Sequence, residues 1–372
     1  MHLENLRLVN YKNYAGLEID LNSSINVFVG KNGSGKTNLL DAVYFLALTK
    51  SAFAATDLQC IRKGETFSML SGRFREGDKV LEISTGIQPG TKKVFRVNGA
   101  EYDKLSDHIG RIPMVLMAPD DTDLVREGSE SRRKFFDGII SQVDKVYLET
   151  LIRYNQALKN RNSMLRMFAD KGKTDFLALE SYDRILADAG DYIYKRRVAF
   201  AAEFQPVFQR NSRLLAGDGE MTKLAYTSQL HESEFADGLK QNRQKDLILQ
   251  RTSFGIHRDD YEFHLETGEM KRFGSQGQQK SFVIALKLAQ YEILRTYKGY
   301  RPILLLDDVF DKLDDDRIER LLTRIHEDSG QMFLTDARPD RTAGLLRGIG
   351  NMPAAVFKVD NGTITGQKQS EQ

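Results

Sequence analysis

The chain has 372 residues, enough for one large domain or two of ordinary size, and its apolar fraction of 41% is sufficient for a packed core. The formal net charge of +2 excludes a protein that is basic throughout, so a surface for nucleic acid would have to be local. A single cysteine, Cys60, excludes an internal disulfide and fits a reducing compartment. No apolar run approaches the roughly 18 residues that a membrane span needs, and the polar residues 1–5 do not resemble a signal peptide. We therefore expect a cytoplasmic protein without a membrane partner.

Residues 3–29 alternate apolar and polar side chains, which predicts a small antiparallel meander of strands. Its first turn, residues 10–14, contains two tyrosines and Lys12. This turn has two interpretations. In the first, its aromatic rings stack on adenine and the lysine touches a phosphate. In the second, it is a turn with amphipathic aromatic side chains and no ligand.

Residues 30–37 read Gly-Lys-Asn-Gly-Ser-Gly-Lys-Thr and match G-x-x-x-x-G-K-[ST], the phosphate-binding loop of nucleotide hydrolases. The apolar run 25–29 before this phosphate loop predicts a buried strand, and a helical pattern follows it. Glycines allow several backbone N–H groups to point at phosphates, and the helix N-terminus adds partial positive charge. The residues expected to bind ATP are Gly30, Lys31, Asn32, Gly33, Ser34, Gly35, Lys36 and Thr37.

Within this loop two side chains have specific expected roles. Lys36 is expected to reach the β- and γ-phosphates and to act in catalysis. The Thr37 hydroxyl is expected to ligate Mg²⁺. The loop therefore predicts ATP and Mg²⁺ as the ligands of this chain.

Further along the chain, residues 67–103 again read as strands, and residues 114–117 as a buried strand. The pattern changes near Thr122 to helical periodicity, at 140–168 and again at 179–207. A break around Gly172 makes the two segments a helical hairpin, with arms on the order of 30 residues each. A strand at 224–227 and a polar helix at 232–250 complete the expected insertion.

After residue 253 the chain returns to core patterns. A strand is expected at 261–265, an apolar helix at 281–294 and a further strand at 332–334, and the tail from Gln367 is expected to be disordered. A helix is also expected at 317–325. The predicted fold class is α/β, a phosphate-loop head of mixed sheets and helices with an inserted helical lid. In sequence, the head comprises 1–121 and 252–372 and the lid or hairpin comprises 122–251.

The apolar strand 303–306 runs into two carboxylates, Asp307 and Asp308. This is the second motif that a phosphate-loop ATPase requires. Asp307 is expected in the Mg²⁺ shell, and Asp308 is expected to orient or deprotonate the attacking water. Both are predicted to be catalytic residues.

Residues 274–280, Gly-Ser-Gln-Gly-Gln-Gln-Lys, resemble the signature motif of ABC-type ATPases. Ser275 is suited to cap the helix that follows, and Gly277 permits close approach to an anion. The resemblance implies that Ser275, Gly277 and Gln278 close over ATP bound by a second copy, so that dimerisation depends on ATP. Residues 311–314 resemble the D-loop of the same superfamily.

The signature lies roughly 240 residues after the phosphate loop because a helical insertion separates them. This organisation resembles the SMC-like DNA-repair ATPases, and the short hairpin resembles the RecF family in particular. The supporting motifs are residues 8–14, 118–121, 128–137, 255–260 and 275–280. The chain is therefore identified as similar to the RecF family over nearly its whole length.

The resemblance implies an ABC-type head with weak, DNA-stimulated ATP hydrolysis. It implies an ATP-dependent homodimer that clamps duplex DNA and gapped or single-stranded junctions at stalled forks, and slow hydrolysis that releases it. It also implies a role in recombinational repair and the SOS response, in which RecR and RecO assist the loading of RecA.

The sequence departs from general ABC patterns at three positions. Asp308 stands where most relatives have Glu, which predicts slow turnover. Ala118-Pro119 replaces the Q-loop glutamine, and Thr335-Asp336 replaces the switch histidine, so the γ-phosphate sensor is unassigned. Ile256 stands where the family pattern has proline.

DNA binding without sequence preference requires Lys and Arg directed at phosphates. Basic residues that could serve are Lys92-Lys93, Arg132-Arg133-Lys134, Lys195-Arg196-Arg197, and Arg153, Lys159, Arg161 and Arg166. They are also explained as ordinary solvated helix faces. His257-Arg258 is interpreted as structural, or as a contact that depends on the DNA or ATP state.

Two other functions remain as alternatives. The first is the ATPase subunit of a membrane transporter, which the long spacing to the signature disfavours. The second is a structural SMC-like tether, which the short hairpin disfavours.

Overall fold

In the computed structural model, the described residues are 1–172, 174–216, 222–309, 318, 320, 321, 324, 330–338 and 353–369. The chain forms two compact units, one of Met1–Asp121 with Ile284–Gln372 and one of Thr122–Val283. The first boundary coincides with the one expected from the sequence, but the second lies later than the expected residue 252. The reason is that residues 260–265 form a strand that pairs with the strand at 222–227, so this segment belongs to the inserted unit.

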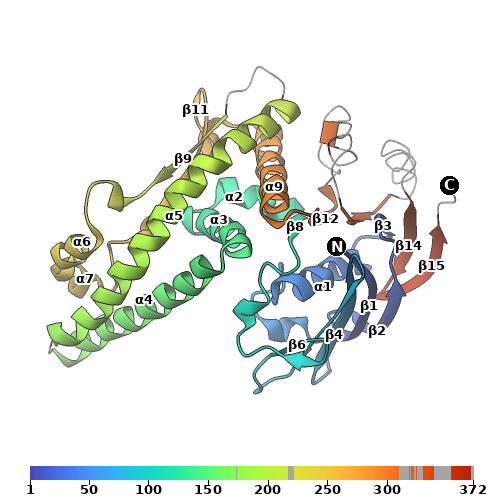
Figure 1. Cartoon of the computed structure of the whole chain (residues 1–372), viewed down its shortest axis with the longest axis horizontal. Coiled ribbons are helices and arrows are strands. Elements are labelled where there is room, and N and C mark those ends of the chain that lie inside the picture. Colours follow the sequence, from blue (N-terminus) through green and yellow to red (C-terminus); the bar gives the residue numbers. More distant parts are fainter. Residues whose placement is uncertain are drawn as a thin grey trace. The chain divides into compact units, whose positions relative to one another are not determined.

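The described residues of the first unit form two sheets of six strands each (Figure 1). The antiparallel sheet has the order β2-β1-β4-β5-β6-β7, with β1 (His2–Tyr11), β2 (Tyr14–Asp20), β4 (Ser68–Glu76), β5 (Lys79–Ile87), β6 (Val94–Val97) and β7 (Ala100–Glu101). The second has the order β15-β14-β3-β13-β12-β8, with β3 (Ile25–Val29), β8 (Met114–Met117), β12 (Ile303–Asp307), β13 (Met332–Asp336), β14 (Ala354–Asp360) and β15 (Thr363–Gln369). The expected meander is therefore wrong for β3, which pairs in parallel with β13 and β14. All five β3 residues are buried, as is typical of a central parallel strand.

Helix α1 (Lys36–Leu48) contacts strands of both sheets, including β1 and β4 on one side and β12 and β13 on the other. Because both sides are covered, its apolar residues are not confined to one face. Leu39, Leu40, Val43, Phe45 and Leu46 are all fully buried in the core of this unit.

The hairpin of β14 and β15 was not expected from the sequence, which predicted a disordered tail from Gln367. In the structure β15 extends to Gln369. Asn361 and Gly362 form the two-residue turn, with φ angles of 45° and 77°. An Asn-Gly pair is the usual choice where both central residues need positive φ, so this turn could have been recognised.

The second unit is mainly helical (Figure 1). Its helices are α2 (Asp123–Arg126), α3 (Ser129–Val143), α4 (Lys145–Lys171), α5 (Phe176–Ala216), α6 (Phe235–Gln241), α7 (Arg243–Leu249), α8 (Met270–Phe273) and the first part of α9 (Gln276–Lys298), which continues into the first unit. Its antiparallel sheet has the order β11-β10-β9, with β9 (Thr222–Thr227), β10 (Asp260–Leu265) and β11 (Gly268–Glu269). Short 3-10 helices elsewhere in the chain cover Asp57–Cys60, Leu105–Asp107, Pro119–Thr122, Gln229–His231 and Ile256–Arg258.

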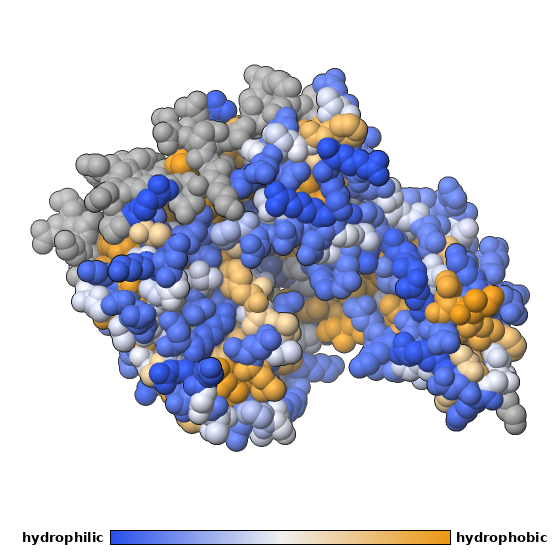
Figure 2. Space-filling view, turned by 180° about the vertical axis from the view of Figure 1, so that it is seen from behind, coloured by the Kyte–Doolittle hydropathy of each residue, from blue (hydrophilic) through white to orange (hydrophobic). Residues whose placement is uncertain are grey.

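Helices α4 and α5 form the predicted hairpin, and Gly172 ends α4 with a φ of 63°. Two boundaries differ from the prediction. The first arm begins at Lys145, so the apolar residues Ile140 and Val143 belong to α3. The polar helix expected at 232–250 is divided at Asn242 into α6 and α7. The face drawn in Figure 2 is largely hydrophilic, with scattered apolar patches.

Asp144 explains why a new helix starts at Lys145. Its carboxylate accepts a hydrogen bond from the Tyr147 N–H at 2.9 Å, which caps the N-terminus of α4, and another from Arg196 Nε at 3.1 Å. We expect Asp144→Ala to lower the free energy of unfolding by about 1–2 kcal/mol, because the cap and the ion pair are lost together. Chemical denaturation measures the change. Asp188→Ala, at an exposed position on α5, is the matched control, and equal stability of the two variants would contradict the capping role.

Among the described residues, none of the helices combines the length and the apolar character that crossing a lipid bilayer requires.

Candidate functional site

The phosphate loop lies at the carboxyl end of β3, where three neighbouring parallel strands end together. In the register of these strands, Val29 pairs with Asp336, and Thr335 pairs with Asp307 of β12. The carboxyl edge of a parallel sheet is the usual place for ligands in α/β folds. The sheet therefore brings the phosphate loop and the Asp307-Asp308 pair, about 270 residues apart in sequence, to one edge.

The glycines of the loop are required by its geometry. Gly33 and Gly35 have φ angles of 78° and 115°, in the region that side chains rarely adopt. A Cβ on Gly30 would lie 2.2 Å from the Val359 carbonyl oxygen. A glycine is therefore needed here because the backbone of β14 passes so close.

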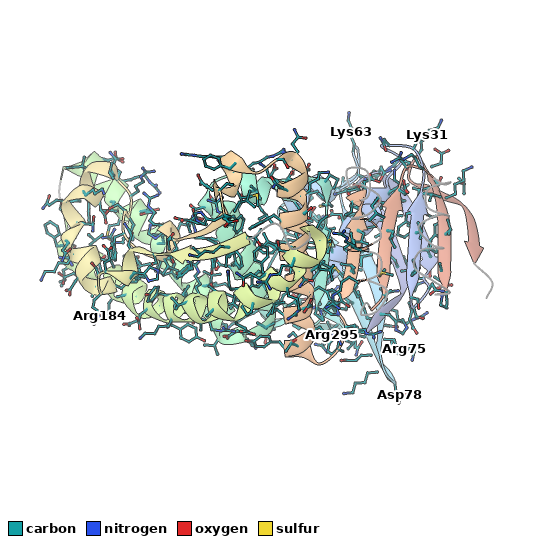
Figure 3. All side chains as sticks on the ribbon, turned by 90° about the horizontal axis from the view of Figure 1, so that it is seen from above. Lys31, Lys63, Arg75, Asp78, Arg184 and Arg295 are labelled. Carbon is teal, nitrogen blue, oxygen red and sulfur yellow. The ribbon has the colours of Figure 1, made fainter. Side chains whose placement is uncertain are left out.

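Lys36 lies across its own loop. Its Nζ donates hydrogen bonds to the carbonyl oxygens of Gly30 at 2.9 Å and Lys31 at 3.1 Å, and the residue is only 4% exposed. The ammonium group is thus held within the loop, where a phosphate would be bound. Lys31, in contrast, points outward from the first unit (Figure 3).

Thr37 and Asp307 lie in direct contact. The Thr37 hydroxyl is 2.9 Å and 3.0 Å from the two carboxylate oxygens of Asp307. The Thr335 hydroxyl donates to Asp307 Oδ1 at 2.7 Å, and it accepts from the Asp308 N–H at 2.9 Å. The two predicted Mg²⁺ ligands are therefore adjacent, and Thr335 links them to Asp308.

From the sequence, Thr335 was not expected in the site and stood out only as a departure from the switch histidine. Its position after the apolar residues 332–334 was a usable signal, since a polar residue at the end of a buried parallel strand lies at the ligand edge. The carboxylate of the next residue, Asp336, accepts from the Arg338 N–H at 2.8 Å and so holds the chain after β13.

Burial raises the pKa of the Asp307 carboxyl, and the nearby Asp308 carboxylate raises it further. The hydrogen bonds from Thr335 and Thr37 and the charge of Lys36 oppose this effect. Asp308 itself is half-buried and has a φ of 45°, a left-handed conformation that aspartate tolerates better than most residues. A bound cation would favour the ionised form of both carboxylates.

These residues fit a nucleoside triphosphate with a hard divalent cation. The Ser34 hydroxyl oxygen in the loop is buried and has no hydrogen-bond partner within the described part of the chain. A hydroxyl beside a carboxylate is the oxygen donor set that Mg²⁺ prefers. Thr37 and Asp307 would hold the cation, which would neutralise phosphate charge, while the loop would hold the phosphates.

The turn at residues 10–14 does not offer its tyrosines for stacking on adenine. Tyr11 and Tyr14 are fully buried. The Tyr11 hydroxyl donates to the buried Asp41 carboxylate at 2.6 Å, and Lys12 forms an ion pair with the same carboxylate at 2.6 Å. The structure therefore supports the alternative without a ligand for these three side chains.

Ser275, Gly277 and Gln278 belong to the second unit. Ser275 caps α9 as expected, since its hydroxyl accepts from the Gln278 N–H at 3.2 Å. Gln278 completes a capping box, because its side-chain oxygen accepts from the Ser275 N–H at 2.8 Å. Ser275 is exposed, so the helix end is available to another molecule. The D-loop expected at 311–314 lies outside the described residues, as does most of the helix expected at 317–325.

Ala118, which stands where the Q-loop glutamine is expected, is held by Asp121, and Asp121 forms an ion pair within the first unit. Lys287 of α9 lies 2.7 Å from the Asp121 carboxylate and donates to the Leu116 carbonyl at 2.8 Å. Asp121 also accepts from the Ala118 N–H at 2.7 Å. These contacts fix the end of β8 and its continuation.

Many of the basic residues considered for DNA are structural. Arg197 is 2% exposed and binds the carboxylates of Asp137 and Asp259, each at 2.9 Å. Arg161 is fully buried and binds Asp183 and Asp246, at 2.6 and 2.7 Å. Four further residues that are at most partly exposed have internal partners, namely Lys93 with Asp57, Arg132 with Asp260, Arg133 with the Asp259 carbonyl, and Arg196 with Asp144. Lys134 and Lys195 form exposed ion pairs with Glu130 and Asp191.

Each of the six buried or partly exposed residues therefore has an acidic or carbonyl partner within its own unit, which favours a structural role for them. Arg153, Lys159 and Arg166 on α4 are exposed. Arg184 on α5, which was not singled out from the sequence, also points outward (Figure 3). The exposed positive charge of the hairpin therefore lies on both of its helices.

The contacts of His257 favour the structural interpretation. Its ring nitrogens are 2.8 Å from the Tyr154 hydroxyl and 3.0 Å from the Thr252 carbonyl. Burial lowers the pKa of His257 to about 4, so the ring is neutral near pH 7. Only Arg258 of the 255–260 motif is exposed.

The family model described as RecF/RecN/SMC N terminal domain matches residues 2–365. The DNA replication and repair protein RecF of Cytophaga hutchinsonii is 44% identical over 372 residues, covering 100% of this chain and 98% of the relative. That of Flavobacterium johnsoniae is 44% identical over 348 residues, covering 93% and 97%.

Among solved structures, the recombination mediator protein RecF-ATP in the RecFOR pathway superposes with a TM-score of 0.88 at 26% identity, covering 100% of this chain and 98% of that chain. The Smc head domain of Pyrococcus furiosus gives a TM-score of 0.55 at 17% identity, covering 99% and 96%, which is a likeness of fold. The match of the family model to residues 2–365 and full-length coverage at 44% identity lead to one conclusion. The chain belongs to the RecF family, within the SMC-like ATPase superfamily.

Proposed function

We propose that this chain is an ATP-dependent, DNA-binding protein of DNA replication and recombinational repair. The observation that carries the proposal is the contact of Thr37 with the Asp307 carboxylate, at 2.9 and 3.0 Å, beside a complete phosphate loop. The names of the full-length relatives, DNA replication and repair protein RecF, support the biological role. The solved RecF-ATP structure supports ATP as the nucleotide.

In the proposed reaction, the loop residues from Gly30 to Thr37 bind the phosphates, with Lys36 at the β- and γ-phosphates. Asp308 accepts a hydrogen bond from the attacking water and orients it, and Thr335 holds the peptide between Asp307 and Asp308 through the Asp308 N–H. Thr37 and Asp307 are the proposed Mg²⁺ ligands. An aspartate base is shorter than the glutamate of most ABC ATPases, so the proposed hydrolysis is slow.

The proposal includes a homodimer that forms on ATP. Ser275, Gly277 and Gln278 of one copy would contact the triphosphate held by the other copy. The exposed Ser275 and its capping box support this, because a helix N-terminus with a free approach is suited to an anion. The closed dimer would clamp duplex DNA and gapped junctions, and hydrolysis would release them.

The partners proposed with this role are DNA, RecR and RecO, with RecA loading and SOS induction as the consequence and the cytoplasm as the location. The solved relatives are RecF proteins of the RecFOR pathway, which supports these partners. The transporter alternative is not favoured, because the chain matches RecF proteins over their full length.

Sedimentation and ATPase assays on the full chain test this function. We expect dimers with ATP and Mg²⁺ and monomers without nucleotide, and we expect faster hydrolysis when duplex DNA is added. DNA affinity measured against salt should fall steeply, since phosphate contacts release counterions. DNA affinity that is independent of both ATP and salt would contradict the clamp, and a chain that does not bind ATP would overturn the proposal.

A further inference from the structure

Two turns outside the phosphate loop hold its carbonyl oxygens. Asn13 Nδ2 and the Gly362 N–H both donate to the Ser34 carbonyl, at 3.0 and 2.9 Å. The Tyr14 hydroxyl donates to the Gly35 carbonyl at 3.1 Å. Asn13 lies in the turn between β1 and β2, Tyr14 is the first residue of β2, and Gly362 lies in the turn between β14 and β15. All of these contacts lie within the first unit.

The direction of a carbonyl determines the direction of the next N–H. In a trans peptide the two groups point to opposite sides, and the described chain contains no cis peptide. Holding the Ser34 carbonyl towards Asn13 and Gly362 therefore turns the Gly35 N–H to the other side of the loop. The same argument applies to the Gly35 carbonyl and the Lys36 N–H.

These N–H groups are the ones that a phosphate needs. Within the described part of the chain, the N–H groups of Gly35, Lys36 and Thr37 donate to no protein acceptor. Gly35 is the N-cap of α1, and Lys36 and Thr37 are its first two residues, where a helix has no intrahelical acceptor to offer. The β1–β2 and β14–β15 turns thus direct these N–H groups to the opposite side of the loop, where they are placed to bind an anion.

Asn13 is itself held in one orientation. Asn38 Nδ2 donates to Asn13 Oδ1 at 2.7 Å, so the amide nitrogen of Asn13 faces the Ser34 carbonyl. A Cβ on Gly35 would lie 2.4 Å from Asn13 Nδ2, and a Cβ on Gly362 would lie 2.4 Å from the Asn13 carbonyl oxygen. Close packing against two glycines and the hydrogen bond from Asn38 leave the Asn13 side chain little freedom to turn.

We propose that Asn13 is a positioning residue for nucleotide binding, which holds the Ser34 carbonyl so that the Gly35 N–H faces the triphosphate. The inference rests on the proposed function, since it assumes that the loop binds ATP. Asn13 acts through the loop backbone, and Asn38 acts through Asn13. The β1–β2 turn is therefore part of the nucleotide site, although its tyrosines do not stack on the base.

ATP affinity of the full-length variants, measured by calorimetry with Mg²⁺, tests the inference. We expect Asn13→Ala to weaken ATP binding about tenfold, because one well-oriented hydrogen bond and the direction of one donor are lost. KM should rise by a similar factor, while kcat at saturating ATP should stay within about twofold, since the groups at the reacting phosphate are unchanged. A role in stability alone would lower the melting temperature and leave KM unchanged.

Asn38→Ala is the second variant and keeps the test valid if Asn13→Ala folds poorly. It should weaken ATP binding by about threefold, and the double variant should bind no more weakly than Asn13→Ala alone, because both changes act on one hydrogen-bonded chain. Asn5→Ala is the matched control, since Asn5 lies on the same hairpin and its amide binds the Asp20 carboxylate at 2.9 Å. It should bind ATP as the unmodified chain does.

The outcomes separate the two proposals. If the unmodified chain binds ATP and neither Asn13→Ala nor Asn38→Ala changes the affinity, the positioning role is wrong and the proposed function stands. Additive losses in the double variant would also overturn it, because they would mean that the two amides act independently. If the unmodified chain fails to bind ATP, the proposed function itself fails.

Discussion

Replacement of Asp308 by Asn is expected to lower the rate of ATP hydrolysis by about 10²- to 10⁴-fold while ATP binding is retained. The amide cannot accept a proton from the attacking water, but it has nearly the same size and leaves the Asp308 N–H bonded to the Thr335 hydroxyl. Asp307, the proposed metal ligand, is unchanged. The variant should therefore accumulate as a dimer with ATP bound, which sedimentation in saturating ATP with Mg²⁺ measures.

The matched control is Asp360→Asn, an exposed aspartate in β14 of the same unit. It carries the same change of charge and should leave both hydrolysis and assembly unchanged. If Asp308→Asn remained a monomer in saturating ATP, the model of a nucleotide sandwiched between two copies would be wrong. Hydrolysis at the normal rate would remove Asp308 from the proposed chemistry but would leave the rest of the site intact.

Replacement of Lys36 by Met is expected to weaken ATP binding about a hundredfold, because a buried ammonium that would bind phosphate oxygens is lost. In the structure Lys36 Nζ is within hydrogen-bond distance of two loop carbonyls, and the methionine side chain is of similar length but cannot donate. ATP-dependent dimerisation and DNA clamping should be lost at ATP concentrations that saturate the unmodified chain. Calorimetric titration with ATP measures the affinity directly.

Lys63→Met is the control for Lys36→Met, since Lys63 is exposed on the first unit (Figure 3). It removes one positive charge from the same unit without touching the loop. Circular dichroism should give the same helix content for both variants. An ATP affinity of Lys36→Met equal to that of the control would exclude a phosphate contact by Lys36.

The local motifs were predicted well because each depends on residues that are adjacent in sequence. The phosphate loop is preceded by β3 and followed by α1, as its pattern indicated, and Asp307 ends a fully buried strand. Ser275 is the expected helix cap. The roles of these site residues in binding and catalysis remain predictions, which the variants described above test.

Contacts between distant segments were not predicted. Thr335 lies against Asp307 only because β13 and β12 are neighbours in register, and Asn13 reaches Ser34 only because two turns meet the same loop. For Arg161 and Arg197, the sequence-based prediction of exposure was wrong. They were counted as surface charge, but Asp183, Asp246, Asp137 and Asp259 enclose them.

The sequence by itself determined the family motifs, the strand, loop and helix around the nucleotide site, and the presence of a helical hairpin, because periodicity and turn chemistry act over a few residues. Only the tertiary structure decided which basic residues are buried, which unit residues 252–283 join, and which side chains outside the loop orient its peptides. The physical reason is that burial and hydrogen-bond partners depend on pairing between segments far apart in the chain, and charge or hydropathy at one position does not specify that pairing.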